Sequence, residues 1–225
     1  MPRRATHDRK RAHGSWNTPT FFRSGSMRKK ISAAMLGMAT VGAFVLSTGG
    51  ASSHGYTDLP ASRQINCAKG VVTGCGAIQY EPQSVEGPKG FPGGGPADGK
   101  ICSAGIAGFS SLDKATKPGG GAWPTTKVSA GQNYSFRWQF TARHRTTDFK
   151  YYITKQGWNE GQPVTRAALD TQPFLNVPYG GQQPPATLSH SGTIPGGRSG
   201  HHVIVAVWTV HDTSNAFYAC SDVQF

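Results

Sequence analysis

The residue of this chain with the clearest chemical potential is a histidine that follows a run of small residues. The stretch VLSTGGASSHGYTDLPASR covers residues 45–63, and His54 comes directly after Ala51-Ser52-Ser53. If the chain is cut after Ser53, His54 gains a free α-amine with a pKa of about 7.7–8.0. That amine and the ring Nδ1 can chelate one metal ion, and one further imidazole would complete three nitrogens in a plane. Such a donor set is typical of tetragonal Cu(II).

The segment before His54 has the pattern of a secretory signal peptide. MRKKISAAMLGMATVGAFVL begins with basic residues, continues with an uncharged, mostly apolar run from Ile31 to Leu46, and is followed by Ala51-x-Ser53. A transmembrane anchor is the alternative, but the run is shorter than the roughly 20 residues that a spanning helix needs. We therefore predict an unusual basic leader or mis-assigned start over residues 1–26, and a signal peptide over 27–53. We predict that residues 54–225 form a single secreted domain.

This cut changes the meaning of the charge. The whole chain has 23 Lys and Arg against 11 Asp and Glu, but residues 54–225 keep only 14 against 10. The basic character belongs mostly to the leader, so a nucleic-acid partner loses its main support. We expect no nucleic-acid partner, and no membrane association after processing.

All four cysteines lie in the predicted mature domain, at Cys67, Cys75, Cys102 and Cys220. An even count behind a signal peptide favours disulfides over a zinc site, and no C-x-x-C pair is present. The short Cys67–Cys75 spacing suits a local disulfide, which leaves Cys102 with Cys220.

The elements that must position these residues are strands. Residues 134–142, 149–155, 201–210 and 216–225 combine aromatic and β-branched residues with alternating polarity. Between Pro60 and Pro124 the chain is rich in Gly, Pro, Ser and Ala and lacks a strand pattern, which predicts an ordered insertion with short helical turns. The predicted fold is all-β: an immunoglobulin- or fibronectin-III-like antiparallel sandwich with a long, partly helical insertion after the first strand.

Three other kinds of site find no support. GRSGH at 197–201 is not the G-x-S-x-G of a serine hydrolase. A glycosidase would use paired carboxylates, and ten acidic residues remain after the cut, but the family resemblance described below gives none of them that role. His201 and His202 are adjacent in a strand, so their rings point to opposite faces and cannot share a metal.

Six motifs in order along residues 54–225 carry a resemblance to a known family. They are HGYTDLPASR, GAIQYEPQSVEG, TARHRTT, YYITKQGW, RSGHHVIVAVW and DTSNAFYACSDV. The chain resembles the bacterial lytic polysaccharide monooxygenases of auxiliary activity family ten, the chitin-binding type. The resemblance implies a copper-dependent, monomeric enzyme that oxidises crystalline chitin at C1 with an external electron donor and O2 or H2O2. Within this family the Cys67–Cys75 pair is common, whereas Cys102 and Cys220 occur only in a subset.

The resemblance also assigns roles to individual residues. His54 and His144 would bind copper, Phe217 would block one axial position, and Ala142 would shape the other. Glu86 would orient the oxygen co-substrate and exchange protons. The substrate-facing surface would include Tyr80, Glu81, Thr141 and Asp212.

Three alternatives remain open at this point. The domain could be a non-catalytic chitin-binding protein, a copper-carrying β-sandwich protein, or an oxidase of cellulose rather than chitin. The substrate-facing motif argues against a carrier, and the His54–His144 pair argues against a binder without activity.

Overall fold

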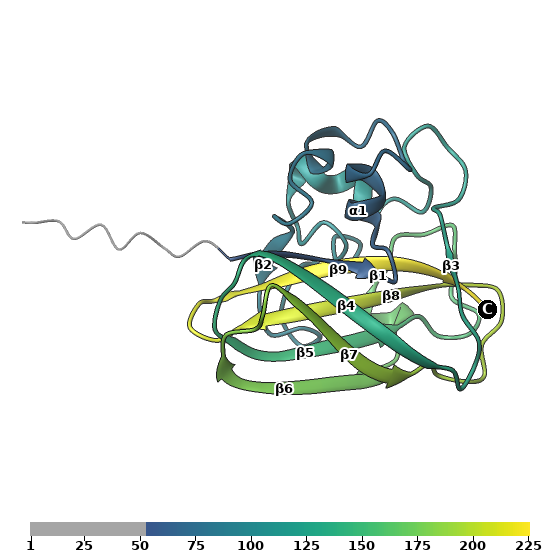
Figure 1. Cartoon of the computed structure of the whole chain (residues 1–225). Coiled ribbons are helices and arrows are strands. Elements are labelled where there is room, and N and C mark those ends of the chain that lie inside the picture. The colour runs from purple at the N-terminus through teal and green to yellow at the C-terminus, as the bar shows by residue number, and fades with distance from the viewer. Residues whose placement is uncertain (1–52) are drawn as a thin grey trace, which may run out of the picture. The chain divides into compact units, whose positions relative to one another are not determined.

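The computed structural model describes residues 53–225 of the chain. The predicted leader, and all of the predicted signal peptide except Ser53, lie outside these described residues. The strands in the described part are β1 His54–Leu59, β2 Glu86–Pro88, β3 Thr126–Lys127, β4 Asn133–Ala142, β5 Thr146–Ile153, β6 Leu175–Gln182, β7 Thr187–Thr193, β8 His201–Val210 and β9 Asn215–Gln224. The helices are α1 Arg63–Ala68 and three short 3-10 segments, η1 Gly76–Gln79, η2 Ala107–Asp113 and η3 Arg166–Ala168 (Figure 1).

Two sheets pack face to face. In the smaller sheet β4 lies between β1 and β7, with both pairs antiparallel. The larger sheet has the order β2-β9-β8-β5-β6, and β3 joins it through a short parallel pair with β9. The predicted antiparallel sandwich is confirmed, with that parallel pair as the exception.

Aromatic side chains fill the space between the two sheets. Trp138 of β4 lies 5.9 Å from Phe149 of β5 and 6.2 Å from Trp208 of β8, measured between ring centroids. Aromatic pairs at such distances stabilise a core by about 0.5–1.5 kcal/mol each beyond the area they bury. The same cluster contains Phe136, Phe140, Tyr151 and Phe217.

The strands predicted over 201–210 and 216–225 are confirmed, but the alternating pattern on which we based them was wrong. Nearly every residue of β8 and β9 is buried. Val203, Val205 and Val207 face one hydrophobic cluster, whereas Ile204, Ala206 and Trp208 face the other. A strand that is covered on both faces requires apolar residues at consecutive positions rather than at alternate ones.

The long segment between β1 and β4 covers the outer face of the larger sheet (Figure 1). It contains α1, η1 and η2, as a partly helical insertion predicts, together with the short strands β2 and β3, which the sequence did not indicate. Its buried residues Ile78, Val85 and Ile101 pack with Val205 and Tyr218 of the sheet.

Both predicted disulfides are confirmed. Cys67 and Cys75 close an 8-residue separation at the end of α1, with 5.9 Å between their Cα atoms. Cys102 and Cys220 join the insertion to β9 across 118 residues, with 5.3 Å between their Cα atoms. One bridge is therefore local, and the other ties the insertion to the sandwich.

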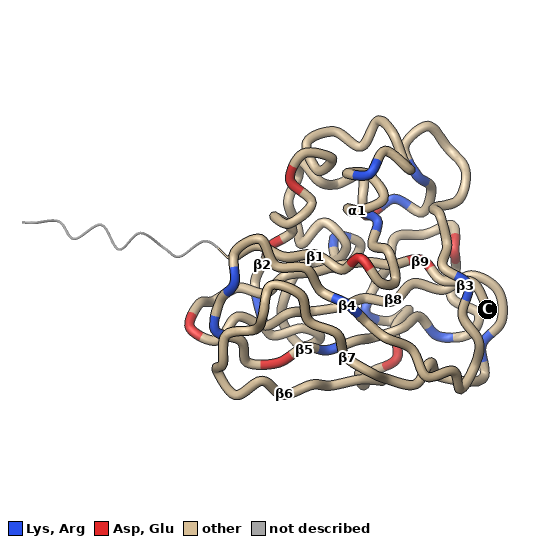
Figure 2. The backbone as a smooth tube through the Cα atoms, viewed as in Figure 1, with Lys and Arg blue, Asp and Glu red and all other residues tan. Residues whose placement is uncertain are grey.

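Basic and acidic residues are interspersed along the described chain (Figure 2). Within residues 53–225, no helix is long and apolar enough to cross a membrane.

Candidate functional site

The two candidate metal ligands come from neighbouring strand ends. His54, the first residue of β1, lies opposite Ala142, the last residue of β4, and His144 follows two residues later. A β-carbon on Gly55 would lie 2.9 Å from Phe140 Cδ1 and 3.2 Å from Trp208 Cζ3. A glycine after His54 therefore lets the start of β1 approach the aromatic core this closely.

His144 lies in the turn between β4 and β5, beside a carboxylate. Its Nδ1 is 2.8 Å from Oδ1 of Asp212, in the turn between β8 and β9, although the direction between the atoms is not that of a hydrogen bond. The His144 side chain is 12% exposed, and that of Asp212 is 40% exposed. A carboxylate beside Nδ1 favours a proton on that nitrogen and leaves the lone pair of Nε2 for a ligand, as is common for metal-binding histidines.

Glu86 and Phe217 lie opposite each other where β2 pairs with β9. The Phe217 ring is buried and stacks on Trp208, with 4.7 Å between ring centroids. Oε1 of Glu86 accepts a hydrogen bond of 2.9 Å from the side-chain amide of Asn215. This contact holds the Glu86 carboxylate in place.

The residues predicted to face the substrate lie on exposed turns and strand ends. Tyr80 follows η1 and is 82% exposed, whereas Glu81 is half-buried. The backbone N–H of Gly55 donates to the carbonyl of Gln83 at 3.1 Å, so this turn is joined to the start of β1. Thr141 is exposed on β4, beside Ala142.

Among residues 53–225, no group of three or more His, Cys, Asp and Glu side chains is arranged as a metal site. Two imidazoles from adjacent strand ends are the arrangement that the resemblance requires. A third nitrogen would have to come from the main chain.

The model of the lytic polysaccharide mono-oxygenase family, described as cellulose-degrading, matches residues 54–223. The chain belongs to this family. The match begins at His54, the residue that the proposed cleavage would expose.

Two curated relatives and two solved structures illustrate the similarity. The AA10 family lytic polysaccharide monooxygenase C of Mycosarcoma maydis is 50% identical over 77% of this chain and 52% of its own length. The GlcNAc-binding protein A of Shewanella oneidensis is 44% identical over 88% of this chain and 41% of its own length. This chain therefore spans about half the length of these relatives or less.

Among solved structures, an AA10 lytic polysaccharide monooxygenase from Streptomyces lividans is 71% identical, with a TM-score of 0.76. The match covers 76% of this chain and 100% of that one. A Bacillus amyloliquefaciens CBM33 protein, solved in complex with Cu(I), is 39% identical with a TM-score of 0.68, over 76% of this chain and 99% of that one.

Three residues at the site were not identified from the sequence. Asn215 stands two residues before Phe217 and so shares its face of a strand, but only the pairing of β2 with β9 brings it to Glu86. Gly55 and Gly87 follow His54 and Glu86 directly, and neither would accept a β-carbon without a close contact. Nothing in their immediate sequence distinguishes these two glycines from the many others in the chain.

Proposed function

We propose that this member of the polysaccharide mono-oxygenase family is a secreted, copper-dependent enzyme that oxidises crystalline chitin at C1. The observation that carries the proposal is the register between β1 and β4. His54 lies opposite Ala142, and His144 follows Ala142 by two residues. Removal of residues 1–53 would give His54 a free amine and complete the donor set. In the uncut chain that nitrogen is a peptide amide.

The residues present fit a copper ion. His54 would supply its α-amine and Nδ1, and His144 would supply Nε2, the ring nitrogen remote from Asp212. Three neutral nitrogens suit Cu(II), which stands highest among divalent first-row metals for such sites. The homologous Bacillus amyloliquefaciens protein was solved with Cu(I) bound, which supports the choice of metal.

Bound copper would supply the redox chemistry that activates an oxygen co-substrate, with electrons from an external donor. The chain's own groups would orient that chemistry. Phe217 cannot bind a metal, so its ring would keep further ligands away on its side of the site, and the small side chain of Ala142 would leave room for the co-substrate. The Glu86 carboxylate, held by Asn215, would orient the co-substrate and hold or release a proton.

The substrate proposal rests on the exposed turn and on the names of relatives. The ring of Tyr80 is exposed and could lie against a sugar, while Glu81, Thr141 and Asp212 offer hydrogen-bonding groups. The name of the Shewanella relative, GlcNAc-binding protein A, favours chitin. The family description names cellulose, which makes cellulose the second candidate substrate.

The first experiment tests processing and metal binding. Amino-terminal sequencing of the secreted protein should begin at His54, and electron paramagnetic resonance should give a tetragonal Cu(II) signal. His54→Ala and His144→Ala should each abolish tight copper binding, because two of three nitrogens cannot hold the ion comparably. A different first residue, or an unchanged spectrum in His144→Ala, would contradict the proposed ligand set.

The second experiment identifies the products by mass spectrometry after incubation with copper, a reductant, and β-chitin or cellulose. We expect aldonic-acid ends on chito-oligosaccharides. Oxidised cello-oligosaccharides alone would overturn the substrate, and binding without oxidation would favour a non-catalytic binder or a copper carrier. Glu86→Gln should keep copper but lose turnover, whereas the matched control Glu160→Gln, at a side chain that is 58% exposed and contacts His201, should lose neither.

A further inference from the structure

We propose that the domain carries a second carbohydrate site, separate from the candidate copper site. Two adjoining cavities form a groove on the side of the insertion, and we infer that it binds a short chain of N-acetylated sugars. This inference does not depend on copper or on the oxidative chemistry.

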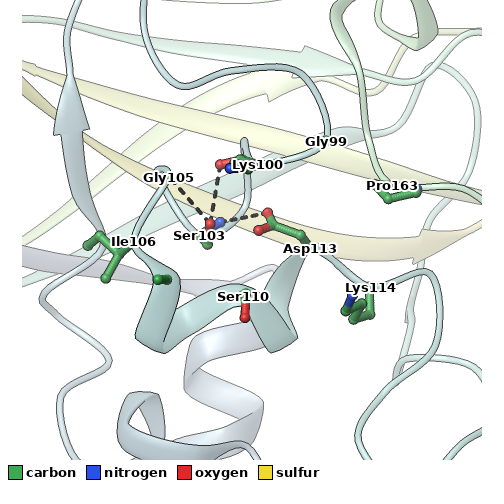
Figure 3. Close-up of a pocket in the computed structure, with 10 residues that line it drawn as sticks. Gly99, Lys100, Ser103, Gly105, Ile106, Ser110, Asp113, Lys114 and Pro163 are labelled. Carbon is green, nitrogen blue, oxygen red and sulfur yellow. Dashed lines mark hydrogen bonds between the residues drawn. The ribbon is translucent and has the colours of Figure 1, made fainter.

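The first cavity has a volume of about 270 Å³ and lies between η2 and the 99–107 segment (Figure 3). Buried Ser103 and Asp113 form its base, and Asp113 Oδ1 accepts a 2.9 Å hydrogen bond from the Ser103 backbone N–H. Half-buried Ile106 and Pro163 contribute apolar surface. The cavity thus combines a buried carboxylate, an apolar wall and two lysines, Lys100 and Lys114.

The second cavity, of about 360 Å³, adjoins the first, and Gly99 and Pro163 line both. Its wall includes the half-buried Trp158 and the exposed amides of Asn159 and Gln162. Each volume is close to the lower end of the roughly 300–1,000 Å³ usual for small-molecule sites, and together they suit a ligand longer than one sugar ring.

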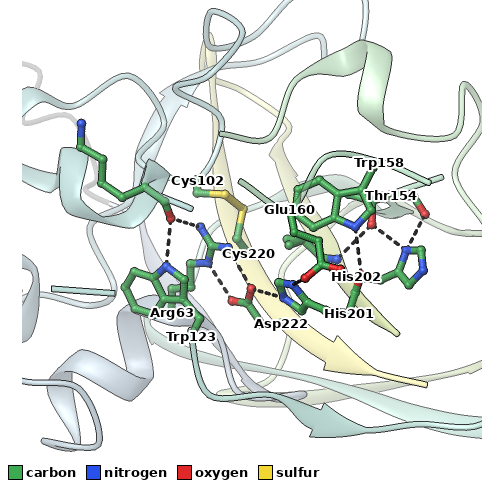
Figure 4. Close-up of polar contacts among 12 residues, drawn as sticks. Arg63, Cys102, Trp123, Thr154, Trp158, Glu160, His201, His202, Cys220 and Asp222 are labelled. Atoms are coloured by element: carbon green, nitrogen blue, oxygen red, sulfur yellow. Dashed lines mark hydrogen bonds and ion pairs between the residues drawn. A yellow bond between two sulfur atoms is a disulfide. The ribbon is translucent and has the colours of Figure 1, made fainter. Parts of the chain in front are cut away.

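A buried ion pair holds both walls of the groove (Figure 4). Arg63 forms two hydrogen bonds with Asp222, at 2.7 and 2.8 Å, and its Nη1 donates to the carbonyls of Leu112 and Lys114, on either side of Asp113. This fixes the base of the first cavity.

The other side of the same ion pair supports Trp158. Asp222 Oδ1 lies 2.8 Å from Nε2 of His201, and the His201 carbonyl accepts a 2.9 Å hydrogen bond from the Trp158 indole N–H. The indole N–H is therefore used internally, and the ring also packs beside that of His201, with 5.7 Å between centroids, so only its remaining exposed part faces the cavity. A groove whose walls are already ordered loses little conformational entropy when it binds.

The Trp158 end of the groove lies at the opposite end of the β8–β9 ladder from Phe217, whereas the first cavity lies beside Ala104, which packs against Gly87. Along the β8–β9 ladder, Trp208 pairs with Phe217 and His201 pairs with Gln224. These two residue pairs are seven positions apart along the strand, which is about 23 Å at roughly 3.3 Å per residue. Tyr80 lines neither cavity.

The chemistry of the groove favours an acetamido sugar. The Asp113 carboxylate can accept from an amide N–H or a hydroxyl, and Ile106 and Pro163 can contact an acetyl methyl group. Burial raises the pKa of Asp113, as expected for a carboxyl group removed from water. The amides of Asn159 and Gln162 suit sugar hydroxyls, and the Trp158 ring suits the apolar face of a pyranose.

The test uses ¹⁵N-labelled secreted protein in EDTA, with tri-N-acetylchitotriose as the probe and cellotriose as the control. We expect the acetylated trimer to shift the Trp158 indole resonance and backbone resonances of 99–114 and 157–165, and cellotriose to bind at least tenfold more weakly. Equal binding of cellotriose would overturn the acetamido assignment. Shifts confined to residues near Tyr80, or no shifts at millimolar trimer, would overturn the groove. Displacement of the trimer by inorganic phosphate would instead identify an anion site around Lys100 and Lys114.

Variants sharpen the test. The double variant Asn159→Ala/Gln162→Ala removes two exposed amides and should weaken trimer binding about tenfold, since each neutral hydrogen bond contributes modestly. The matched control Gln172→Ala/Asn176→Ala removes exposed amides of the same types elsewhere and should bind normally. Equal losses in the test and control variants would contradict the proposal, and chitin oxidation, measured separately, would remain a test of the copper proposal alone.

Discussion

On one face of the larger sheet, a second sheet packs through rings from Phe136, Trp138 and Trp208. On the other face, the irregular insertion is held by the Cys102–Cys220 disulfide and by the Arg63–Asp222 ion pair, in addition to its apolar contacts. Regular strands present an apolar row with a fixed period, so packing alone aligns the two sheets. The insertion has no such regular apolar row. A disulfide and a buried ion pair therefore hold it in place on the sheet. The candidate site draws on both faces, because His54 and His144 come from the smaller sheet and its adjoining turn, whereas Glu86 comes from the insertion.

The largest expected effect is loss of the long-range disulfide. Cys102→Ala/Cys220→Ala opens a separation of 118 residues, and the chain-entropy estimate for such a loop is about 5 kcal/mol of unfolding free energy. The matched control Cys67→Ala/Cys75→Ala opens only 8 residues, for about 2.5 kcal/mol by the same estimate. Urea unfolding measures both. Equal losses would mean that loop length does not determine how each bridge stabilises the domain.

The buried ion pair comes next. Arg63→Met keeps a long side chain but leaves the Asp222 carboxylate buried without its cation, which should lower the unfolding free energy by about 3–5 kcal/mol. The Arg63 guanidinium also lies 4.9 Å from the centre of the Trp123 ring, so packing on the insertion would loosen as well. As a control, Arg137→Met breaks a pair with Asp58 in which the arginine is 40% exposed, and the change should be much smaller. Similar changes in the two variants would contradict the contrast between a buried link and a surface pair.

The dependence of stability on pH should separate the two faces. Burial in the aromatic core lowers the pKa of His190 to about 4, so its contribution is full above about pH 6.5 and is lost as the pH falls toward 4. Loss of this contribution at low pH should reduce the unfolding free energy by at most about 3 kcal/mol. His190→Gln should flatten this acid limb of the stability curve in urea unfolding measured from pH 4 to 8.

The insertion face should respond on the alkaline side. The hydrogen bond to Asp222 raises the pKa of His201 against the effect of burial, so the His201 contribution is full below about pH 6.5 and is lost as the pH rises through the folded pKa. His201→Gln should therefore flatten the limb above pH 6.5. Burial opposes the ionisation of Asp222, but Arg63 holds its pKa below the usual value, so the Asp222 contribution is lost as the pH falls through that lowered pKa. If both histidine variants altered the same limb, the assignment of each limb to one face would be wrong.

The smallest effects on stability, about 1–3 kcal/mol for an overpacked site, are expected at the two site glycines. A β-carbon on Gly87 would lie 2.5 Å from the Ala104 carbonyl oxygen, so Gly87→Ala should displace Glu86 from the insertion side. Gly55→Ala should displace His54 from the core side. We therefore expect Gly55→Ala to weaken copper binding, and Gly87→Ala to retain copper but turn over more slowly. Copper titration and product release measure the two, and the reverse outcome would contradict the division of roles.

The sequence alone was enough for the class of fold, the four long strands and both disulfides. Strand periodicity and aromatic content are local properties, and four cysteines with one short spacing leave a favoured pairing. The residues of the candidate site were nameable because they stand within motifs of a known family.

Other features depended on contacts between distant segments. The burial of β8 and β9 on both faces follows from the insertion folding back over the sheet, which no local pattern specifies. Asn215 beside Glu86 and Asp212 beside His144 became visible only once β2 paired with β9 and the two turns met. The groove beside Trp158 likewise requires Arg63, Asp222 and His201 to meet from three separate parts of the chain. Hydrogen bonds and ion pairs act over a few ångströms, so tertiary packing decides which distant groups come within that range.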